Sequence, residues 1–311
     1  MKKIRIIAQL TIGIIIIAFI LNKLNINDVL LILKKTDPVY FIFACFAYLG
    51  MNLVLSSSLT YLLKKIGYKI GYKAVFFSHM GGMVVGDITP GRSGYFLTPP
   101  ILKKNAGVGI TDGMACIFAP QGIEFVLKVG GAFAAVLYIS SFSNISRSFL
   151  ISSGIGAFLL LMVGILMLII SWKNESLSLR FLQRIPFFKN FTENLLCFKE
   201  KSIMIKESMN VILMLYAISW IFAAMQWFFL GKALGLNISF FAFFLLHPLI
   251  SLLMFVPLLP IGLGIMDFGT ILVFSFFGIP SVSALAFALL VRASILLVDL
   301  IGIKTVFTAH E

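Results

Sequence analysis

Charged residues are scarce in this chain, and acidic residues are the scarcest. Asp, Glu, Lys and Arg together make up 12% of the 311 residues, and only 12 residues are Asp or Glu. Soluble domains carry about 25% charged residues, whereas 60% of this chain is hydrophobic and 32 residues are Phe. The composition excludes a soluble globular domain. It predicts an all-α integral membrane protein, with residues 1–311 forming a single polytopic domain.

Cysteine is also scarce, and the common motifs of catalysis are missing. Cys45, Cys116 and Cys197 are isolated, with no CxxC and no Cys/His cluster. We therefore expect neither a zinc site nor a disulfide framework. The sequence has no P-loop, and Gly107-Val108-Gly109 lacks the preceding strand and the third glycine of a dinucleotide-binding loop. We expect no catalytic residue, no metal and no cofactor, and a protein that is not an enzyme.

The net charge of +13 comes from 25 basic residues against the few acidic ones. These basic residues lie between hydrophobic runs, where the positive-inside rule places them. No basic-aromatic patch and no nucleic-acid motif accompanies them. We therefore expect contact with anionic membrane lipids and no binding of nucleic acid.

Six apolar runs approach or exceed the length of about 20 residues that crosses a bilayer. They predict membrane-spanning helices over about 4–22, 39–63, 113–140, 148–171, 208–231 and 283–305. Two further apolar segments, 74–101 and 239–278, are interrupted by proline and glycine, which predicts broken or re-entrant helices. The interruptions run from Asp87 to Gly94, with Pro90 and Gly91, and from Pro257 to Gly264, with Pro260 and Gly262.

The positions of Lys and Arg distinguish between two topologies. If segment 74–101 enters and leaves on one side, seventeen of the 25 basic residues lie in the cytoplasm and five lie outside. If the segment crossed fully, the seven basic residues of 172–207 would face outward, against the positive-inside rule. We therefore predict a re-entrant segment, a cytoplasmic N-terminus and a basic cytoplasmic loop over 172–207. That loop is either an ordinary connection or an amphipathic helix on an anionic leaflet.

With this topology, the halves 1–147 and 148–311 have the same order of elements in opposite orientations. Each half contains two helices, a re-entrant pair and a further helix. Inverted repeats whose broken helices meet near the bilayer midplane are a recurrent plan of transporters. The order of elements therefore predicts an inverted repeat, although the sequence shows no residue-level repeat.

Ionisable residues in the first break are candidates for a binding site. Charges at membrane depth are costly unless they line a cavity or contact protein. The guanidinium of Arg92 matches a lipid phosphate bidentately, and backbone N–H groups around Gly91 and Gly94 can add donors. The other interpretation is an ion pair between Arg92 and Asp87 that holds the break.

Four further charged residues fall on predicted membrane helices. Glu124 and Lys128, four residues apart, share a helix face. They either neutralise each other or line a cavity that contacts a zwitterionic headgroup. Asp267 is expected in the first turn of a helix, where it is a candidate partner for a cationic headgroup or for Arg292. A buried Arg292 needs a partner, and Asp267 and Asp299 are both candidates.

Two passages resemble the flippase-like transmembrane family named after lysylphosphatidylglycerol synthase, also labelled UPF0104. The first is Gly86-Asp87-Ile88-Thr89-Pro90-Gly91-Arg92-Ser93-Gly94-Tyr95, and the second is Pro257-Leu258-Leu259-Pro260-Ile261-Gly262-Leu263-Gly264-Ile265-Met266-Asp267. Their order, their spacing and the chain length match over nearly the whole chain. This chain has Asp267 where the family usually has Glu. It also has Tyr95 and Thr98 where the first motif often has Glu and Arg, a form that looks like an archaeal-type variant.

The resemblance implies a lipid-handling membrane domain. In the best-understood relatives this domain is joined to a cytosolic aminoacyl transferase and moves the aminoacylated phospholipid to the outer leaflet. Because the chain ends at Glu311, we expect no transferase here. The expected function is that of a lipid flippase or lipid-binding transporter in the cell membrane. Its expected ligand is a phosphorylated headgroup, on an anionic phospholipid or an isoprenoid phosphate.

Two other functions stay open: an accessory subunit that recruits a glycosyltransferase or lipid-modifying enzyme, and a small-solute or ion transporter. The candidate substrate-binding residues are Asp87, Arg92, Gly94, Tyr95, Glu124, Lys128, Asp267 and Arg292. The candidate structural breaks are Pro90, Gly91, Pro257, Pro260, Gly262 and Gly264.

Overall fold

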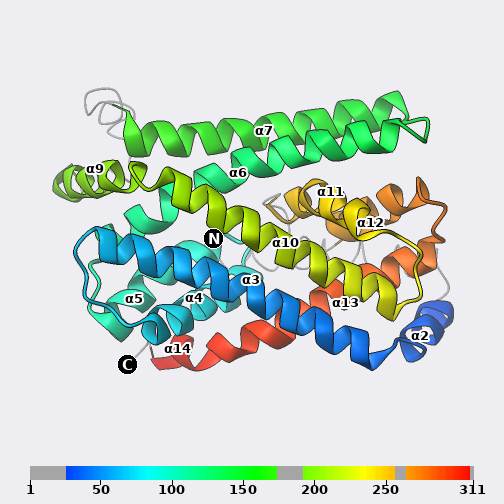
Figure 1. The fold of residues 1–311 in the computed structure, drawn as a ribbon, viewed down its shortest axis with the longest axis horizontal. Helices are drawn as coiled ribbons and strands as arrows, with labels where there is room; N and C mark the ends of the chain where they lie inside the picture. Colours follow the sequence, from blue (N-terminus) through cyan, green and yellow to red (C-terminus); the bar gives the residue numbers. More distant parts are fainter. Residues whose placement is uncertain (1–25, 174–191, 256–263, 309–311) are drawn as a thin grey trace, which may run out of the picture.

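The computed structural model describes residues 26–173, 192–255 and 264–308, and every regular element in these ranges is a helix. Within them, five helical segments are long and apolar enough to cross a membrane. They are α3 (Pro38–Lys65), α6 (Ile110–Ser140), α7 (Arg147–Trp172), α10 (Met209–Ala233) and α13 (Ser281–Asp299), which continues through the 3-10 turn η4 (Leu300–Gly302) into α14 (Ile303–Thr308) (Figure 1). The prediction of an all-α integral membrane protein is confirmed.

The spans predicted from hydropathy agree closely with these helices. Segments 39–63, 113–140, 148–171 and 208–231 correspond to α3, α6, α7 and α10, with ends that agree within about three residues. Segment 283–305 is one apolar run in the sequence, but η4 interrupts the helix there. At this point Gly302 packs so tightly on the backbone of Met80 that a Cβ would have no room. The predicted helix 4–22 lies outside the described residues.

The first interrupted segment enters and leaves at one end of the molecule. It connects the end of α3 to the start of α6, and both of these points lie at the left in Figure 1. Its parts are α4 (Tyr72–Asp87), the 3-10 helix η1 (Ser93–Leu97) and α5 (Thr98–Ala106), and α5 packs back against α4. The predicted re-entrant path of 74–101 agrees with this arrangement.

The second interrupted segment lies at the opposite end. It connects the end of α10 to the start of α13, at the right in Figure 1. Its described parts are α11 (Phe240–Ser251), the 3-10 turn η3 (Leu252–Phe255) and α12 (Ile265–Ser275). The order of long helix, broken pair and long helix thus occurs twice, in opposite directions, as the predicted inverted repeat requires. The predicted breaks Pro257, Pro260 and Gly262 lie outside the described residues.

Basic side chains gather at the end of the molecule where the first broken segment opens, which we call the basic end. The opposite end carries fewer of them. Figure 1 places the ends of α3, α5 and α9 and the short helix α14 at the basic end; these helices carry Lys64 and Lys65, Lys103 and Lys104, Lys206, and Lys304. The end of α2, the start of α7 and the end of α10 lie at the opposite end, with Lys34, Arg147 and Lys232.

Two short helices lie outside the predicted membrane spans. The expected basic loop 172–207 contains α9 (Thr192–Lys206), which packs against α6 and α7 and buries Phe198 and Ile205. Of the two alternatives for this segment, the helix agrees with the described residues 192–206, and its buried Phe198 and Ile205 face protein. The helix α2 (Ile26–Lys34) likewise buries Val29 against Leu285 and Ala286 of α13.

We predict that the basic end faces the cytoplasm, because Lys and Arg favour that side. Single cysteines at the exposed positions Lys104, Lys206 and Lys232, in a variant without the three native cysteines, test this orientation. We expect an impermeant thiol reagent applied to whole cells to label Lys232→Cys only. Labelling of Lys104→Cys from outside the cell would contradict the prediction. Labelling of Lys104→Cys and Lys206→Cys from different sides would contradict the re-entrant path as well.

Candidate functional site

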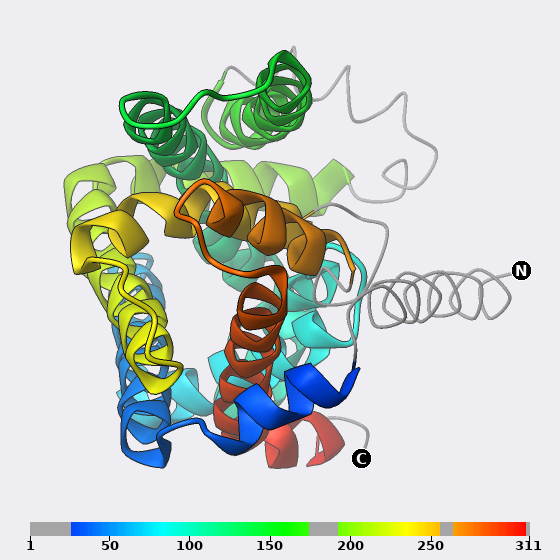
Figure 2. The same cartoon turned by 90° about the vertical axis from the view of Figure 1, so that its right-hand side faces the viewer.

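A cavity lies between the two broken segments, in the middle of the helix bundle. Its volume is about 160 Å³, more than ten times the ~10–15 Å³ that one water requires. The helices that line it include α3, α10, α11 and α13, which are arranged around a common centre when the bundle is viewed from one end (Figure 2). Most of the lining is apolar, and its polar side chains include Arg92, Tyr95, Gln121, Glu124, Lys128 and His247.

The backbone of the first break places Arg92 at the cavity wall. Helix α4 ends at Asp87, and both Gly91 (φ 62°) and Arg92 (φ 53°) then adopt the left-handed conformation. Among the described residues, Arg92 alone has a positive φ without being glycine. This conformation is uncommon for a residue with a side chain of this size. The hydroxyl of Thr89 accepts a hydrogen bond from the N–H of Gly94 at 2.7 Å. Gly94 packs so close to the backbone carbonyl of Val85 that no larger residue fits.

Arg92 forms the ion pair that the sequence suggested and also lines the cavity. Its Nε and Nη2 donate to Oδ1 of Asp87 at 3.1 and 2.5 Å. The same Nη2 lies 3.9 Å from Oδ2 of Asp299, which accepts a hydrogen bond from the hydroxyl of Tyr48 at 3.0 Å. Both carboxyl side chains are 2% exposed, and that of Arg92 is 15% exposed. Arg92 can therefore pair with Asp87 and line the cavity at the same time.

Tyr95 belongs to a hydrogen-bonded chain that connects residues of the cavity wall across α4 and α3. Its hydroxyl lies 3.0 Å from Nδ1 of His79, whose Nε2 lies 3.0 Å from the side-chain oxygen of Asn52. Asn52 in turn donates to the carbonyl of Tyr48 at 3.0 Å. The chain holds α4 and the first break against α3, so that Tyr95 presents its ring to the cavity in a fixed orientation.

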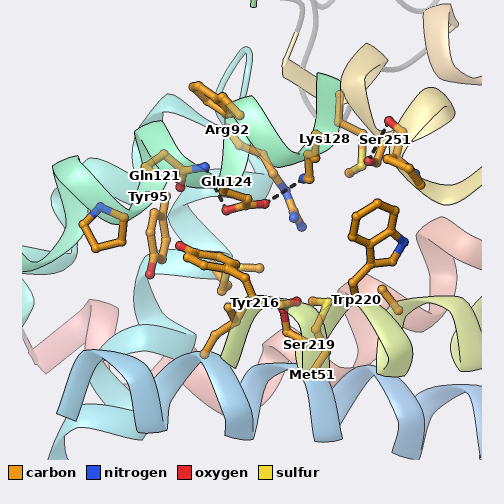
Figure 3. A pocket seen from close by; sticks show the side chains of 18 of the residues that line it. Met51, Arg92, Tyr95, Gln121, Glu124, Lys128, Tyr216, Ser219, Trp220 and Ser251 are labelled. Atoms are coloured by element: carbon orange, nitrogen blue, oxygen red, sulfur yellow. Dashed lines mark hydrogen bonds and ion pairs between the residues drawn. The ribbon is translucent and has the colours of Figure 1, made fainter. Parts of the chain in front are cut away.

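Helix α6 supplies a second charged wall. Glu124 accepts a hydrogen bond from Gln121 at 2.9 Å and forms an ion pair with Lys128 at 2.7 Å. Figure 3 shows these side chains and Arg92 on one side of the cavity, with Tyr216 and other side chains of α10 facing them. The predicted pairing of Glu124 and Lys128 is confirmed, and both residues line the cavity.

The second break holds a separate ion pair beside the cavity. Asp267 lies in the first turn of α12, as predicted, and accepts a hydrogen bond from the N–H of Gly264 at 2.8 Å. Its carboxylate contacts Nη2 of Arg292 at 3.1 Å, with side-chain exposures of 1% and 9%. Asp267 is therefore the partner of Arg292, and Asp299 belongs to the Arg92 cluster instead. The cavity is lined by the neighbouring residues Met266 and Val291, and Asp267 and Arg292 lie behind them.

Comparison with known protein families gives a match that includes both broken segments. A sequence model described as the lysylphosphatidylglycerol synthase TM region matches residues 6–302, a range that includes both breaks. The chain belongs to this family. Another similar protein is the UPF0104 membrane protein MJ1078 of Methanocaldococcus jannaschii, with 23% identity over 210 residues, or 68% of this chain and 87% of that protein. The resemblance to the lysylphosphatidylglycerol synthase TM family is confirmed.

Four of the eight candidate residues line the cavity: Arg92, Tyr95, Glu124 and Lys128. Asp87 and Gly94 support the first break from behind. Sequence reasoning did not single out the aromatic and amide residues of α3 and α10 that complete the wall: Tyr48, Tyr216, Trp220, Gln226 and Trp227. No pattern in the sequence distinguishes them from the many other aromatic residues. Among the described residues, no group of three His, Cys, Asp or Glu residues could hold a metal ion.

Proposed function

We propose that this protein binds membrane lipids with a phosphorylated headgroup and moves them between leaflets, without converting them chemically. The observation that carries the proposal is the cavity between the two broken segments, which holds Arg92 and Lys128 in a mostly apolar lining. A guanidinium presents two parallel donors that match the oxygens of a phosphate. In this proposal the phosphate lies against Arg92 while the acyl or isoprenoid chains stay in the bilayer.

The charges of the cavity suit a headgroup that carries both signs or one negative charge. Lys128 is paired with Glu124, so this wall presents an acceptor and a donor side by side. Membrane proteins retain ionisable residues at this depth mainly where they serve a substrate pathway or pair with each other. The polar lining therefore supports a headgroup site, and the membership in a family named for a lipid synthase supports a lipid.

The two broken segments provide a route for alternating access. They open from opposite ends of the bundle and both line the cavity. In transporters with inverted repeats, movement of one repeat against the other exposes a central site to each side in turn. We place the protein in the cell membrane with its basic end in the cytoplasm, so that the first segment controls the cytoplasmic opening.

Reconstitution of the full chain tests the proposal. We expect the purified protein to retain anionic phospholipid, measured by mass spectrometry of extracted lipids. We also expect proteoliposomes to move a fluorescent phosphatidylglycerol between leaflets faster than protein-free liposomes. A labelled diacylglycerol, which lacks the phosphate, serves as the control for general disturbance of the bilayer. Equal rates with and without protein would contradict transport and would favour an accessory subunit that needs a partner enzyme.

A further inference from the structure

The cluster behind Arg92 contains one more acidic group than its bases can neutralise. One guanidinium nitrogen of Arg92 faces both Asp87, at 2.5 Å, and Asp299, at 3.9 Å. Oδ2 of Asp87 and Oδ1 of Asp299 are buried, and no group in the described part of the chain donates a hydrogen bond to them. Two buried carboxylates beside one cation carry a net negative charge, which is costly in a medium of low polarity.

The two carboxyl groups approach the same cation from different helices. Asp87 lies on α4 and Asp299 on α13, and both face Nη2 of Arg92. An ionised carboxylate has no proton to donate, so neither acid can donate to a free oxygen of the cluster while both are charged. A single proton, once bound by the pair, supplies the missing donor and makes the cluster neutral, as in other carboxyl pairs that share one proton.

We propose that Asp87 and Asp299 form a proton-binding site, which takes up one proton when a lipid phosphate binds Arg92. This inference rests on the proposed lipid function and adds a coupling ion to it. A bound phosphate draws the positive charge of Arg92 toward the cavity and away from the two carboxyl groups. The carboxyl pair then holds a proton more tightly, so lipid binding and proton binding favour each other.

The structure offers a route between this site and the cavity. Tyr48 lines the cavity and donates its hydroxyl to Asp299 at 3.0 Å. A hydroxyl that donates to a carboxylate can accept a proton from the other side, so Tyr48 is the candidate relay. Sodium fits the site less well, since Arg92 already occupies the position of a cation beside Asp87.

Among the described residues, two other groups contact the carboxyl pair. Tyr48 approaches it from α3 and Arg92 from the first break. On α4, His79 contacts Asn52 and Tyr95 rather than the carboxyl pair. The remaining acid and base of α12 and α13 that lie near the cavity, Asp267 and Arg292, contact each other. Proton uptake that is lost in the Asp299→Asn variant would therefore come from the Asp87–Asp299 pair.

Calorimetry of lipid binding tests the coupling. The probe is short-chain phosphatidylglycerol, whose phosphodiester keeps one negative charge between about pH 5 and about pH 8. Titration of the detergent-purified full chain in two buffers with different ionisation enthalpies gives the number of protons taken up. We expect about one proton per lipid, and an affinity that rises as the pH falls, by at most about tenfold per pH unit.

Asp299→Asn mimics the protonated side chain and keeps an acceptor for Tyr48. We expect this variant to bind the lipid without proton uptake, with an affinity that no longer depends on pH. Asp87→Asn is the second variant, for use if the first does not fold. Glu207→Gln removes an exposed carboxylate at the basic end, 71% exposed and paired with Lys65. It is expected to retain both the affinity and the proton uptake of the natural protein.

Each other outcome overturns the inference in a recognisable way. Lipid binding without proton uptake in the natural protein would leave the proposed function intact and remove the coupling. Proton uptake that persists in Asp299→Asn and disappears in His247→Gln would assign the proton to the cavity histidine instead. Lipid binding that depends on sodium rather than on pH would show that the coupled cation is sodium and not the proton. Absence of lipid binding at every pH would overturn the proposed function and the coupling together.

Discussion

Loss of either member of the Asp267–Arg292 pair is expected to destabilise the protein by about 3–5 kcal/mol, because it leaves the other charge buried without its partner. Nε and Nη1 of Arg292 have no other acceptor in the described part of the chain. Loss of Asp267 would therefore leave Arg292 as a buried cation that water does not reach. The variants Asp267→Asn and Arg292→Met keep approximately the size of each side chain while removing one charge.

The double variant Asp267→Asn/Arg292→Met is expected to cost less than the sum of the single variants. The difference, of about 0.5–3 kcal/mol, measures the coupling between groups in contact. Chemical unfolding in detergent micelles provides the free energies. Strictly additive costs would show that the two residues do not interact.

The exposed pair of Lys65 and Glu207 provides a matched control. Its atoms lie 3.1 Å apart, the same separation as in the buried pair, but the side chains are 37% and 71% exposed. Water and salt screen such a pair, so the same cycle is expected to give no more than about 1 kcal/mol. The comparison separates the effect of burial from the effect of distance.

The spans and their interruptions could be predicted because the bilayer imposes a strict rule on the chain. Only continuous helices of about 20 apolar residues satisfy their backbone groups in lipid. The hydropathy of α3, α6, α7 and α10 follows this rule directly. Proline and glycine between Asp87 and Gly94 had to interrupt the helix for the same reason. The helix α2 was missed because it is short and packs one apolar face on protein.

The partners across the bundle could not be predicted, because lipid-facing and protein-facing surfaces are both apolar in a membrane helix. The exposed Phe46 and the buried Tyr48 are neighbours on α3, and nothing in their pattern shows which one faces the cavity. The contact of Arg92 with Asp299 likewise joins segments far apart in the chain. The sequence left Asp267 and Asp299 as alternative partners of Arg292. The structure pairs Arg292 with Asp267 and places Asp299 beside Arg92.

Arg92 cannot be tested by alanine alone, because the change would leave Asp87 and Asp299 buried beside no cation. A charge-matched pair of variants avoids this difficulty. Arg92→Lys retains the charge and loses the planar fork. Arg92→Gln combined with Asp87→Asn removes one positive and one negative group and keeps polar side chains at both positions. Both proteins are expected to fold, and a thermal melt in detergent checks this requirement.

Binding of short-chain phosphatidylglycerol is expected to weaken by about tenfold in Arg92→Lys, equivalent to about 1.4 kcal/mol, because a bidentate contact becomes a single one. The double variant loses hydrogen bonds from a charged donor that contribute about 1.5–3 kcal/mol each, so its affinity is expected to fall more than about a hundredfold. Lys104→Gln removes a basic residue exposed at the basic end, and its affinity is expected to stay unchanged. A folded double variant with undiminished affinity would show that Arg92 serves only to neutralise the carboxyl pair, and the headgroup site would then have to lie at Lys128.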